Sequence, residues 1–277
     1  MYILDTSAIR GVGQSQLKHA VGRGVCLTVC PITCFELASH LTEGTENDYA
    51  RARGNFLKCC IPRILDDSAV RWADRAGVPE RINPSRREDR DLLTQMLQIV
   101  SQAPFIDDLH ARYLRYADDV LCPLTDCGRV YAEILLGEER SYVNRMERLL
   151  KEARFFSEPG APYTITKEVL LANLEQAGRG SPPDMSISRR RALRKAMAQA
   201  PYIGYMLHRL YERKNKGGKI DVNDYEDALI CLAIDWAVGD VLVTSDEGTI
   251  EALQGTARLL EREDCVMPTR QFVERYG

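Results

Sequence analysis

The chain has 277 residues, of which 28% are charged, and a formal net charge of −3 at pH 7. This length is sufficient for a hydrophobic core without disulfides, and the charge excludes a general attraction of the whole molecule to nucleic acid. No apolar run is long enough to cross a membrane, and no secretory signal is present. Nine cysteines without a Cys-x-x-Cys pair indicate free thiols in a reducing cytoplasm.

The first elements are two short strands, each followed by an acidic residue. Tyr2–Leu4 is an apolar strand that ends at Asp5, and Val25–Val29 is the second strand. A helix is expected to begin after Pro31, which suits a helix start, with Glu36 in its first turn. A short helix over Gln14–Val21 lies between the two strands.

The middle of the chain has helical periodicity and almost no strand pattern. Residues 45–219 are therefore predicted to be a mostly helical insertion or cap, part of which completes the core. Gly178–Pro183 is its clearest flexible joint. The helices expected there are Glu46–Cys60, Asp66–Ala76, Glu88–Ser101, Asp107–Val120, most of Arg129–Phe156, Thr164–Ala177, Ser188–Ala200 and Tyr202–Lys214.

Near its end the chain returns to a strand pattern. Asp224 and Asp227 lie three residues apart on one face of a helix that Gly239 is expected to stop. Val241–Val243 is a buried strand, and Asp246 follows it. A short helix over Glu247–Leu253, an edge strand over Arg258–Leu260 and a terminal helix over Thr269–Tyr276 complete the predicted elements.

Acidic residues at strand ends suggest a shared site. In open parallel α/β sheets, ligands bind outside the carboxyl ends of the strands, so Asp5 and Asp246 are expected to point into one region. Converging carboxylates repel one another, and a cation offsets that repulsion. Mg²⁺ and Mn²⁺ prefer such hard oxygen ligands.

Four stretches resemble the PIN-domain nucleases in sequence and in order. They are Leu-Asp5-Thr-Ser, Pro-Ile-Thr-Cys-Phe-Glu36-Leu, Asp227-Ala-Leu-Ile and Leu-Val-Thr-Ser-Asp246. The resemblance covers about a third of the chain, at its two ends. It implies a PIN-like three-layer α/β/α core with a central parallel sheet, formed by residues 1–44 and 220–277, plus the large helical insertion.

The resemblance also implies a reaction. We expect metal-dependent hydrolysis of RNA that leaves a 5′-phosphate and a 3′-hydroxyl, with Mg²⁺ or Mn²⁺ held by Asp5, Glu36, Asp227 and Asp246. Asp224 is either a reserve metal ligand or a residue that contacts the ligands without contacting the metal. The hydroxyls that would orient waters or phosphate are those of Thr6, Ser7, Thr244 and Ser245. The resemblance allows a toxin role with an antitoxin or other regulatory partner, and it leaves homo-oligomers open.

Charge is unevenly distributed along the chain. Residues 179–219 contain eleven Lys/Arg against two acidic residues, whereas residues 220–264 contain twelve Asp/Glu against two arginines. The RNA-binding surface predicted from the basic segment consists of Arg189, Arg190, Arg191, Arg194 and Lys195. The alternative for this run is an ordinary solvated helix face.

Other functions stay open on sequence grounds. Each carboxylate alone is more typical of a helix cap or turn than of a metal ligand. One alternative is a PIN-like module that binds RNA or a protein without cutting. Another is a metal-dependent phosphatase or DNA nuclease that uses the same acidic cluster.

Overall fold

The architecture is a parallel sheet covered by helices. The computed structural model describes residues 1–42, 44–77, 89–110, 112–115, 121–126, 139–148, 186–188, 191–192, 195, 201–216, 220, 222–259 and 261–277. Its central sheet has five strands in the order β3-β2-β1-β6-β7, and every neighbouring pair is parallel. These strands are β1 (Tyr2–Leu4), β2 (Leu27–Val29), β3 (Arg63–Ile64), β6 (Val241–Thr244) and β7 (Val266–Pro268).

Helices precede, separate and follow the strands. The first group is α1 (Thr6–Gly11), α2 (Gln14–Gly22), α3 (Pro31–Ser39), α4 (Glu46–Leu57), α5 (Ser68–Ala76), α6 (Asp89–Ser101) and α7 (Asp107–His110). The second group is α11 (Tyr202–Lys216), α12 (Val222–Ala233), α13 (Glu247–Leu259) and α14 (Thr269–Tyr276). A further helix covers residues 139–148. Short 3₁₀ turns are η1 (His40–Thr42), η2 (Lys58–Cys60), η5 (Leu124–Asp126) and η6 (Trp236–Val238).

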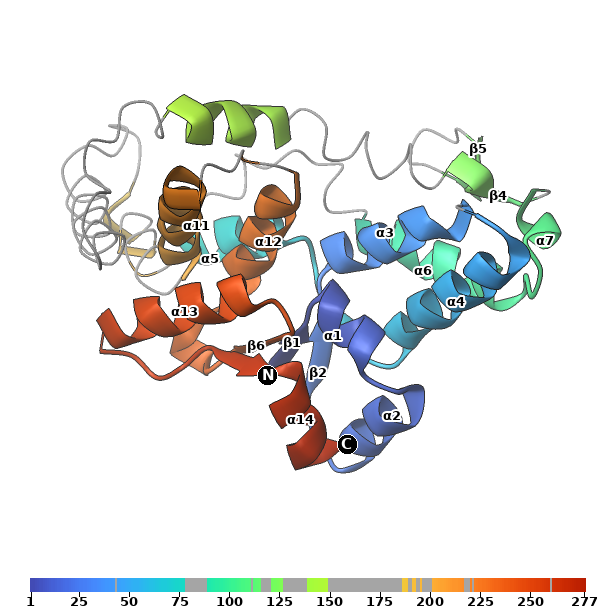
Figure 1. Cartoon of the computed structure of the whole chain (residues 1–277), viewed down its shortest axis with the longest axis horizontal. Helices are drawn as coiled ribbons and strands as arrows, with labels where there is room; N and C mark the ends of the chain where they lie inside the picture. The colour runs from blue at the N-terminus through green and yellow to red at the C-terminus, as the bar shows by residue number, and fades with distance from the viewer. Residues whose placement is uncertain are drawn as a thin grey trace.

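The sheet is buried on both faces, which makes three layers. Within β1, Leu4 packs into a core with α1 to α4, α6 and α14, whereas Ile3 packs into a second core with α11, α12 and α13. This alternation follows from the period of two along a strand. Figure 1 shows α11, α12 and α13 on one side of the sheet and α3, α4 and α6 on the other. The predicted three-layer α/β/α fold with a central parallel sheet is confirmed.

The strand order places a reversal beside β1. The chain leaves β1 for β2 and β3 on one side and returns to β6 and β7 on the other. In such sheets, the point where the order reverses is where ligands bind, outside the carboxyl ends of the strands. Asp5 and Ser245 directly follow β1 and β6 at this edge.

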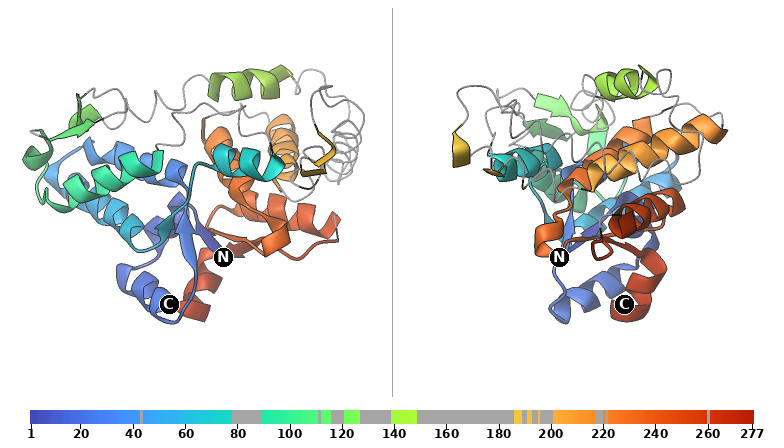
Figure 2. Two further views of the ribbon diagram at one scale, coloured as in Figure 1. Left: turned by 180° about the vertical axis from the view of Figure 1, so that it is seen from behind. Right: turned by 90° about the vertical axis from the view of Figure 1, so that its left-hand side faces the viewer.

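The two chain ends are packed together. The Tyr2 hydroxyl lies 2.6 Å from the Tyr276 hydroxyl, and the Tyr2 ring also contacts Phe272. Helix α14 packs on α2, and both lie below the sheet in Figures 1 and 2. Residues 1–44 and 220–277 supply four of the five sheet strands, and β3 at one edge lies within residues 45–219.

Three element predictions are wrong. The helix predicted over Asp107–Val120 stops at His110, and residues 113–115 and 121–123 instead form the antiparallel strands β4 (Tyr113–Arg115) and β5 (Leu121–Pro123). The strand predicted over Arg258–Leu260 is occupied by α13 as far as Leu259, because buried Leu253 and Ala257 continue the apolar stripe of that helix. The edge strand is β7 instead.

The third error concerns the stop of the acidic helix. Helix α12 ends at Ala233, before the predicted stop. Asp235 caps η6 instead, by accepting a hydrogen bond from the Ala237 amide at 2.9 Å. Gly239, with φ of 70°, ends that short turn.

Some predictions lie outside the described residues. They include the helix Thr164–Ala177, the joint Gly178–Pro183 and most of the helix Ser188–Ala200. None of the described helices combines the length and the apolar character that a membrane crossing requires.

Candidate active site

Asp5 is fixed at the carboxyl end of β1 by its role as a helix cap. Its Oδ1 accepts a hydrogen bond from the Ala8 amide at 2.7 Å, at the start of α1. The Ser7 hydroxyl donates to the same oxygen at 2.9 Å. The residue is only 6% exposed. The local sequence therefore holds this carboxylate in one orientation, largely out of water.

Hydroxyl groups join the end of β1 to the end of β6. The Ser7 Oγ lies 3.3 Å from the Thr244 Oγ1 and accepts a hydrogen bond from the Ser245 amide at 2.7 Å. Thr244 Oγ1 in turn accepts from the Asp246 amide at 3.0 Å. Asp246 caps α13 through its Oδ1, which accepts from the Thr249 amide at 2.6 Å. The residues that follow the two neighbouring strands, Asp5 and Asp246, are thus connected through the Ser7 hydroxyl, the Thr244 hydroxyl and the Asp246 amide.

Glu36 comes from α3 and faces the start of α1. The Thr6 hydroxyl donates a short hydrogen bond to its Oε2. Arg10 approaches the other oxygen, with Nη2 3.8 Å from Oε1. Because α3 follows β2 through the helix-starting Pro31, Glu36 lies at the same edge of the sheet as Asp5.

Asp227 comes from α12 and is held by Tyr205. The Tyr205 hydroxyl donates to Asp227 Oδ2 at 3.1 Å. Burial raises the pKa of Asp227 to about 7, and the negative charges of Asp246 and Asp5 add to that rise. Burial likewise raises the pKa of Asp5 to about 6, with Glu36 adding, against hydrogen bonds from Thr244, Ala8 and Ser7 that lower it. The four predicted carboxylates are therefore close enough to repel one another.

Glu226 is a fifth member of this group that the sequence analysis missed. It is 6% exposed. Burial raises its pKa to about 8, and Glu36 and Asp227 add to the rise. The only signal in the sequence was its position directly before Asp227, because a lone Glu in the first turns of a helix is an ordinary residue. We call Asp5, Glu36, Glu226, Asp227 and Asp246 the acidic centre.

Two predicted residues lie at the margin of the acidic centre or outside it. Ser245 donates from its hydroxyl to Thr269 Oγ1 at 2.9 Å, away from the carboxylates. Asp224 is buried and bound by two arginines: Arg209 Nε donates to its Oδ1 at 2.9 Å, and Arg213 Nε donates to its Oδ2 at 3.2 Å. Its carboxylate is therefore neutralised by guanidinium groups, which does not favour the reserve-ligand role.

Replacement of Asp224 by asparagine tests this view. It leaves two partly buried guanidiniums without their shared carboxylate, so we expect the free energy of unfolding to fall by about 3–5 kcal/mol. Denaturant unfolding measures that loss, and calorimetric titration with Mn²⁺ on the folded variant checks that metal affinity is retained. Unchanged stability together with lost Mn²⁺ affinity would instead make Asp224 a ligand.

The donor atoms of the acidic centre suit a hard divalent cation. Carboxylate oxygens are the preferred ligands of Mg²⁺ and Mn²⁺. Burial, with the neighbouring negative charges adding to it, raises the pKa values of Asp5 and Asp227, and a bound cation would favour their ionised forms. Among the residues that the structure describes, no three of these carboxylates bring oxygens within 4.8 Å of one another. An ion held by these carboxylates would therefore have to keep several water ligands, as Mg²⁺ does.

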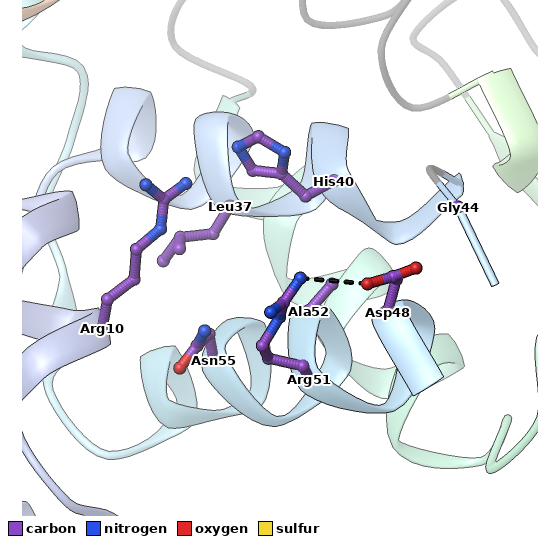
Figure 3. A pocket seen from close by; sticks show the side chains of 8 residues that line it. All are labelled: Arg10, Leu37, His40, Gly44, Asp48, Arg51, Ala52 and Asn55. Atoms are coloured by element: carbon purple, nitrogen blue, oxygen red, sulfur yellow. Dashed lines mark hydrogen bonds and ion pairs between the residues drawn. The ribbon is translucent and has the colours of Figure 1, made fainter. Parts of the chain in front are cut away.

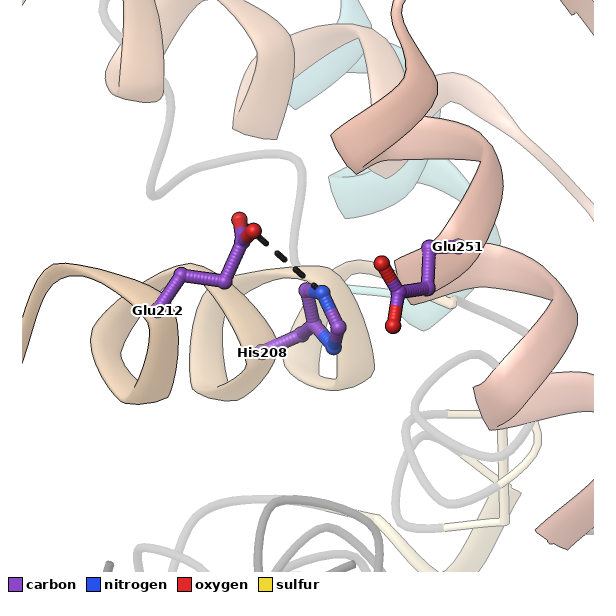
Figure 4. Close-up of side chains that lie close together, drawn as sticks. All are labelled: His208, Glu212 and Glu251. Atoms are coloured by element: carbon purple, nitrogen blue, oxygen red, sulfur yellow. Dashed lines mark ion pairs between the residues drawn. The ribbon is translucent and has the colours of Figure 1, made fainter. Parts of the chain in front are cut away.

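A second polar group lies beside the acidic centre on α11 and α13. The ligand atoms of His208, Glu212 and Glu251 lie within 4.8 Å of one another (Figure 4). Arg209 Nη1, however, donates to Glu212 Oε2 at 2.7 Å, and that same oxygen lies 3.9 Å from His208 Nε2. Because a guanidinium already neutralises Glu212, we describe this group as an ion-pair network rather than a metal site.

A glycine allows this network to reach the acidic centre. A Cβ atom at Gly248 would lie 2.7 Å from Arg209 Nη1, 3.4 Å from Asp246 Oδ1 and 3.5 Å from Glu212 Oε2. These three charged groups therefore surround Gly248, where a larger side chain would collide with Arg209. Arg209 lies between Asp224, Glu212 and Asp246, and its positive charge lowers the pKa of Asp227.

A pocket adjoins the acidic centre through Arg10. It has a volume of about 520 Å³ and is shown in Figure 3. Its lining combines three basic side chains with neutral ones and with Asp48, which pairs with Arg51 at 3.0 Å. The lining residues are Arg10, Leu37, His40, Gly44, Asp48, Arg51, Ala52 and Asn55.

The predicted RNA-binding run is only partly described. Arg191 and Lys195 are exposed, and Arg189, Arg190 and Arg194 lie outside the described residues. This predicted surface stays a prediction.

Comparison with known proteins gives no relative for this chain. No family model matches it, and neither a curated protein nor a solved structure does. A functional proposal therefore depends on the residues of the acidic centre and their surroundings.

Proposed function

We propose that this chain is a PIN-like, metal-dependent endoribonuclease that hydrolyses RNA phosphodiester bonds. One observation carries the proposal. Carboxylates from β1, α3, α12 and the end of β6 gather where the strand order reverses, and mutual repulsion contributes to the raised pKa values of Asp5 and Asp227. Such a concentration of charge is costly without a cation, so a catalytic role explains it better than four separate helix caps.

Each residue of the centre has a position that suggests a role. Asp5, Asp227 and Asp246 would hold a Mg²⁺ or Mn²⁺ ion, with Glu36 and Glu226 facing its water ligands. When bound, such an ion lowers the pKa of an attacking water and stabilises charge on the leaving oxygen. Ser7 holds the Asp5 carboxylate, Thr6 holds that of Glu36 and Tyr205 holds that of Asp227, so the ligands are oriented before any ion binds.

The neighbouring arginines suggest how a phosphate chain would meet this centre. A carboxylate cluster alone repels a polyanion, and Arg10, which lines the adjoining pocket, supplies positive charge 3.8 Å from Glu36 Oε1. Guanidinium groups match the geometry of phosphate oxygens. The substrate would therefore contact basic side chains on one side of the centre while its reacting phosphate faces the carboxylates.

The test is cleavage of a mixed RNA pool. We expect Mn²⁺ or Mg²⁺ to support cutting, EDTA to stop it and Asp227→Asn to abolish it, since the substitution removes a ligand charge. Gel separation of end-labelled RNA measures the cutting, and mapping of the ends checks for 5′-phosphates. Parallel reactions with single-stranded and flapped DNA identify a DNA nuclease.

Two outcomes would contradict the proposal. A folded protein that binds RNA but cuts no nucleic acid with either metal is a binding module. Cutting that persists in EDTA and in Asp227→Asn would place the chemistry elsewhere. If the enzyme is of the toxin type, expression of the active chain will arrest growth, expression of Asp227→Asn will not, and an antitoxin partner will relieve the arrest.

A further inference from the structure

The helix of residues 139–148 has an anchored face and a basic face. Tyr142 and Met146 are buried in the core that also contains α11 and α12. Arg140, Arg145 and Arg148 are exposed. Figure 1 shows this unlabelled green helix above α11 and α12, at the opposite end of the molecule from α2 and α14.

The basic face lines a pocket. The five described residues that line it follow the spacing of one helical face over about two turns, about 140° of the circumference. The pocket has a volume of about 520 Å³. The five residues, which we call the arginine face, are Arg140, Ser141, Asn144, Arg145 and Arg148.

Among the described residues, the charge of this face acts on Glu139: Arg140 lowers the pKa of that carboxyl, against burial, which raises it. No ion pair in the described part of the chain engages any of its three arginines. The helix also carries Glu139 and Glu147, but neither is among the described residues that line the pocket. An ordinary solvated helix face intersperses charges of both signs as neighbours three or four residues apart. Here the two glutamates flank a basic pocket instead.

The arginine face is coupled to the acidic centre through a single helix. The ring of Tyr142 packs on that of Tyr225 in α12, with centroids 5.2 Å apart. Tyr225 is adjacent to Glu226 and two residues from Asp227. Burial raises the pKa of the Tyr142 hydroxyl, and the charges of Asp224 and Asp227 add to that rise. Helix α12 therefore carries Glu226 and Asp227 and also supports the buried side of the helix that bears the arginine face.

We propose that the arginine face binds the phosphate backbone of a single-stranded polynucleotide and directs it toward the acidic centre. The purpose of this binding site rests on the proposed nuclease function. Binding itself can be measured without cleavage, so it is tested separately. Arginine forks pair with two phosphate oxygens at once, and Ser and Asn side chains hydrogen-bond to phosphate and sugar oxygens. A single strand is favoured because its flexible backbone can follow a bent path from one helix to the next.

An acidic protein segment is the competing partner. It would satisfy the same guanidinium groups, but the acidic centre would only repel it. A polynucleotide carries the phosphodiester that a metal in the acidic centre would bind. The observations therefore favour the nucleic acid.

The experiment measures binding in EDTA, where a metal-dependent enzyme cannot cut. Fluorescence anisotropy of a labelled 20-nucleotide single-stranded RNA measures its affinity for the full chain at KCl concentrations from 50 to 300 mM. For the triple variant Arg140→Glu, Arg145→Glu and Arg148→Glu we expect affinity at 50 mM KCl to fall by at least about tenfold. We also expect the magnitude of the slope of log K against log salt to shrink by about 2. Each of the three lost phosphate contacts on a single strand accounts for about 0.7 of this change.

The matched control reverses three other exposed charges. Lys18→Glu, Arg23→Glu and Arg270→Glu change the net charge by the same amount on α2, on the turn after it and on α14, far from the arginine face. We expect the control to retain most of its affinity and its salt slope. Thermal unfolding confirms that both triple variants are folded. Conservative Arg→Lys changes at the three positions should keep part of the affinity, because charge remains but the fork geometry is lost.

Each result decides the inference. Equal losses in the two triple variants, or no loss in the first, would overturn it. Loss of binding to a poly-glutamate peptide but not to RNA would assign the face to an acidic protein. If the wild-type chain binds RNA through this face but never cuts with Mn²⁺, the inference stands and the proposed function fails. If it cuts RNA with unchanged affinity in the arginine variant, the function stands and the inference fails.

Discussion

Replacing Asp5 with asparagine will lower RNA cleavage by at least about 10²-fold and leave the fold intact. A bound metal contributes several kcal/mol to transition-state stabilisation, and each 1.4 kcal/mol corresponds to a tenfold change in rate. Asparagine caps a helix as well as aspartate does, so the hydrogen bond from the Ala8 amide is retained. The change therefore removes a ligand charge without removing the cap.

Initial rates on end-labelled RNA at saturating Mn²⁺ measure this effect. Asp107→Asn is a matched control, because that carboxylate is 91% exposed and belongs to α7, outside the acidic centre. The control should cut at the wild-type rate. Full activity of Asp5→Asn would remove Asp5 from the site, and loss of activity in both variants would show an effect of net charge rather than of a ligand.

Metal-free protein will become more stable as the pH falls from 8 to 5. The folded chain holds Asp5 with a pKa of about 6, Asp227 with one of about 7 and Glu226 with one of about 8. In the unfolded chain these groups titrate near pH 4. Between about pH 4 and pH 8 the folded state therefore binds more protons than the unfolded state, so stability falls as the pH rises.

The size of this effect can be bounded from Asp5, the most modest of the three. Its raised pKa corresponds to about 3 kcal/mol over the whole titration. About 1.4 kcal/mol of this falls between pH 5 and pH 8, which is roughly 3–6 °C in melting temperature for a chain of this size. Melting curves in EDTA at pH 5 and pH 8 measure it. A variant with Asp5→Asn, Asp227→Asn and Glu226→Gln should show a much weaker pH dependence. Mn²⁺ at pH 8 should stabilise the wild-type chain and not this variant.

A flat or reversed pH profile in EDTA would contradict this prediction. So would an equal slope in the wild-type chain and the triple variant, because the pH dependence would then come from other groups. The carboxylates would in that case be ionised at no cost, and the electrostatic reason for a cation would disappear.

Much of the core was predictable because its signals are local. The strand Tyr2–Leu4 and the helix Thr269–Tyr276 have the predicted bounds, since each is an uninterrupted pattern with clear ends. The gathering of Asp5 and Asp246 followed from one general rule about parallel sheets. The antiparallel pair β4 and β5 was missed because pairing of Tyr113 with Pro123 is a non-local contact, which local periodicity does not report.

The gathering of the predicted carboxylates was predictable from the sequence, but their surroundings were not. Glu226 was missed because its importance comes from burial against Glu36, a residue 190 positions earlier in the chain. Asp224 was given a ligand role because its spacing from Asp227 is right. Only the structure shows that Arg209 and Arg213 bind it. The arginine face escaped notice because its residues are spread over one helical face instead of forming a visible basic run.

The strand order also determines when activity can first exist during synthesis. Strand β1 is central in the sheet, and its partner β6 begins at residue 241. A ribosome-bound chain that has emerged to residue 200 carries Asp5 and Glu36 but neither Asp227 nor Asp246, and its first strand has no neighbour on one side. Such a fragment has half of the predicted ligands and an open sheet edge. On the proposed function, the chain would stay inactive until nearly all of it has been made, and one edge of β1 would stay unpaired for the same time.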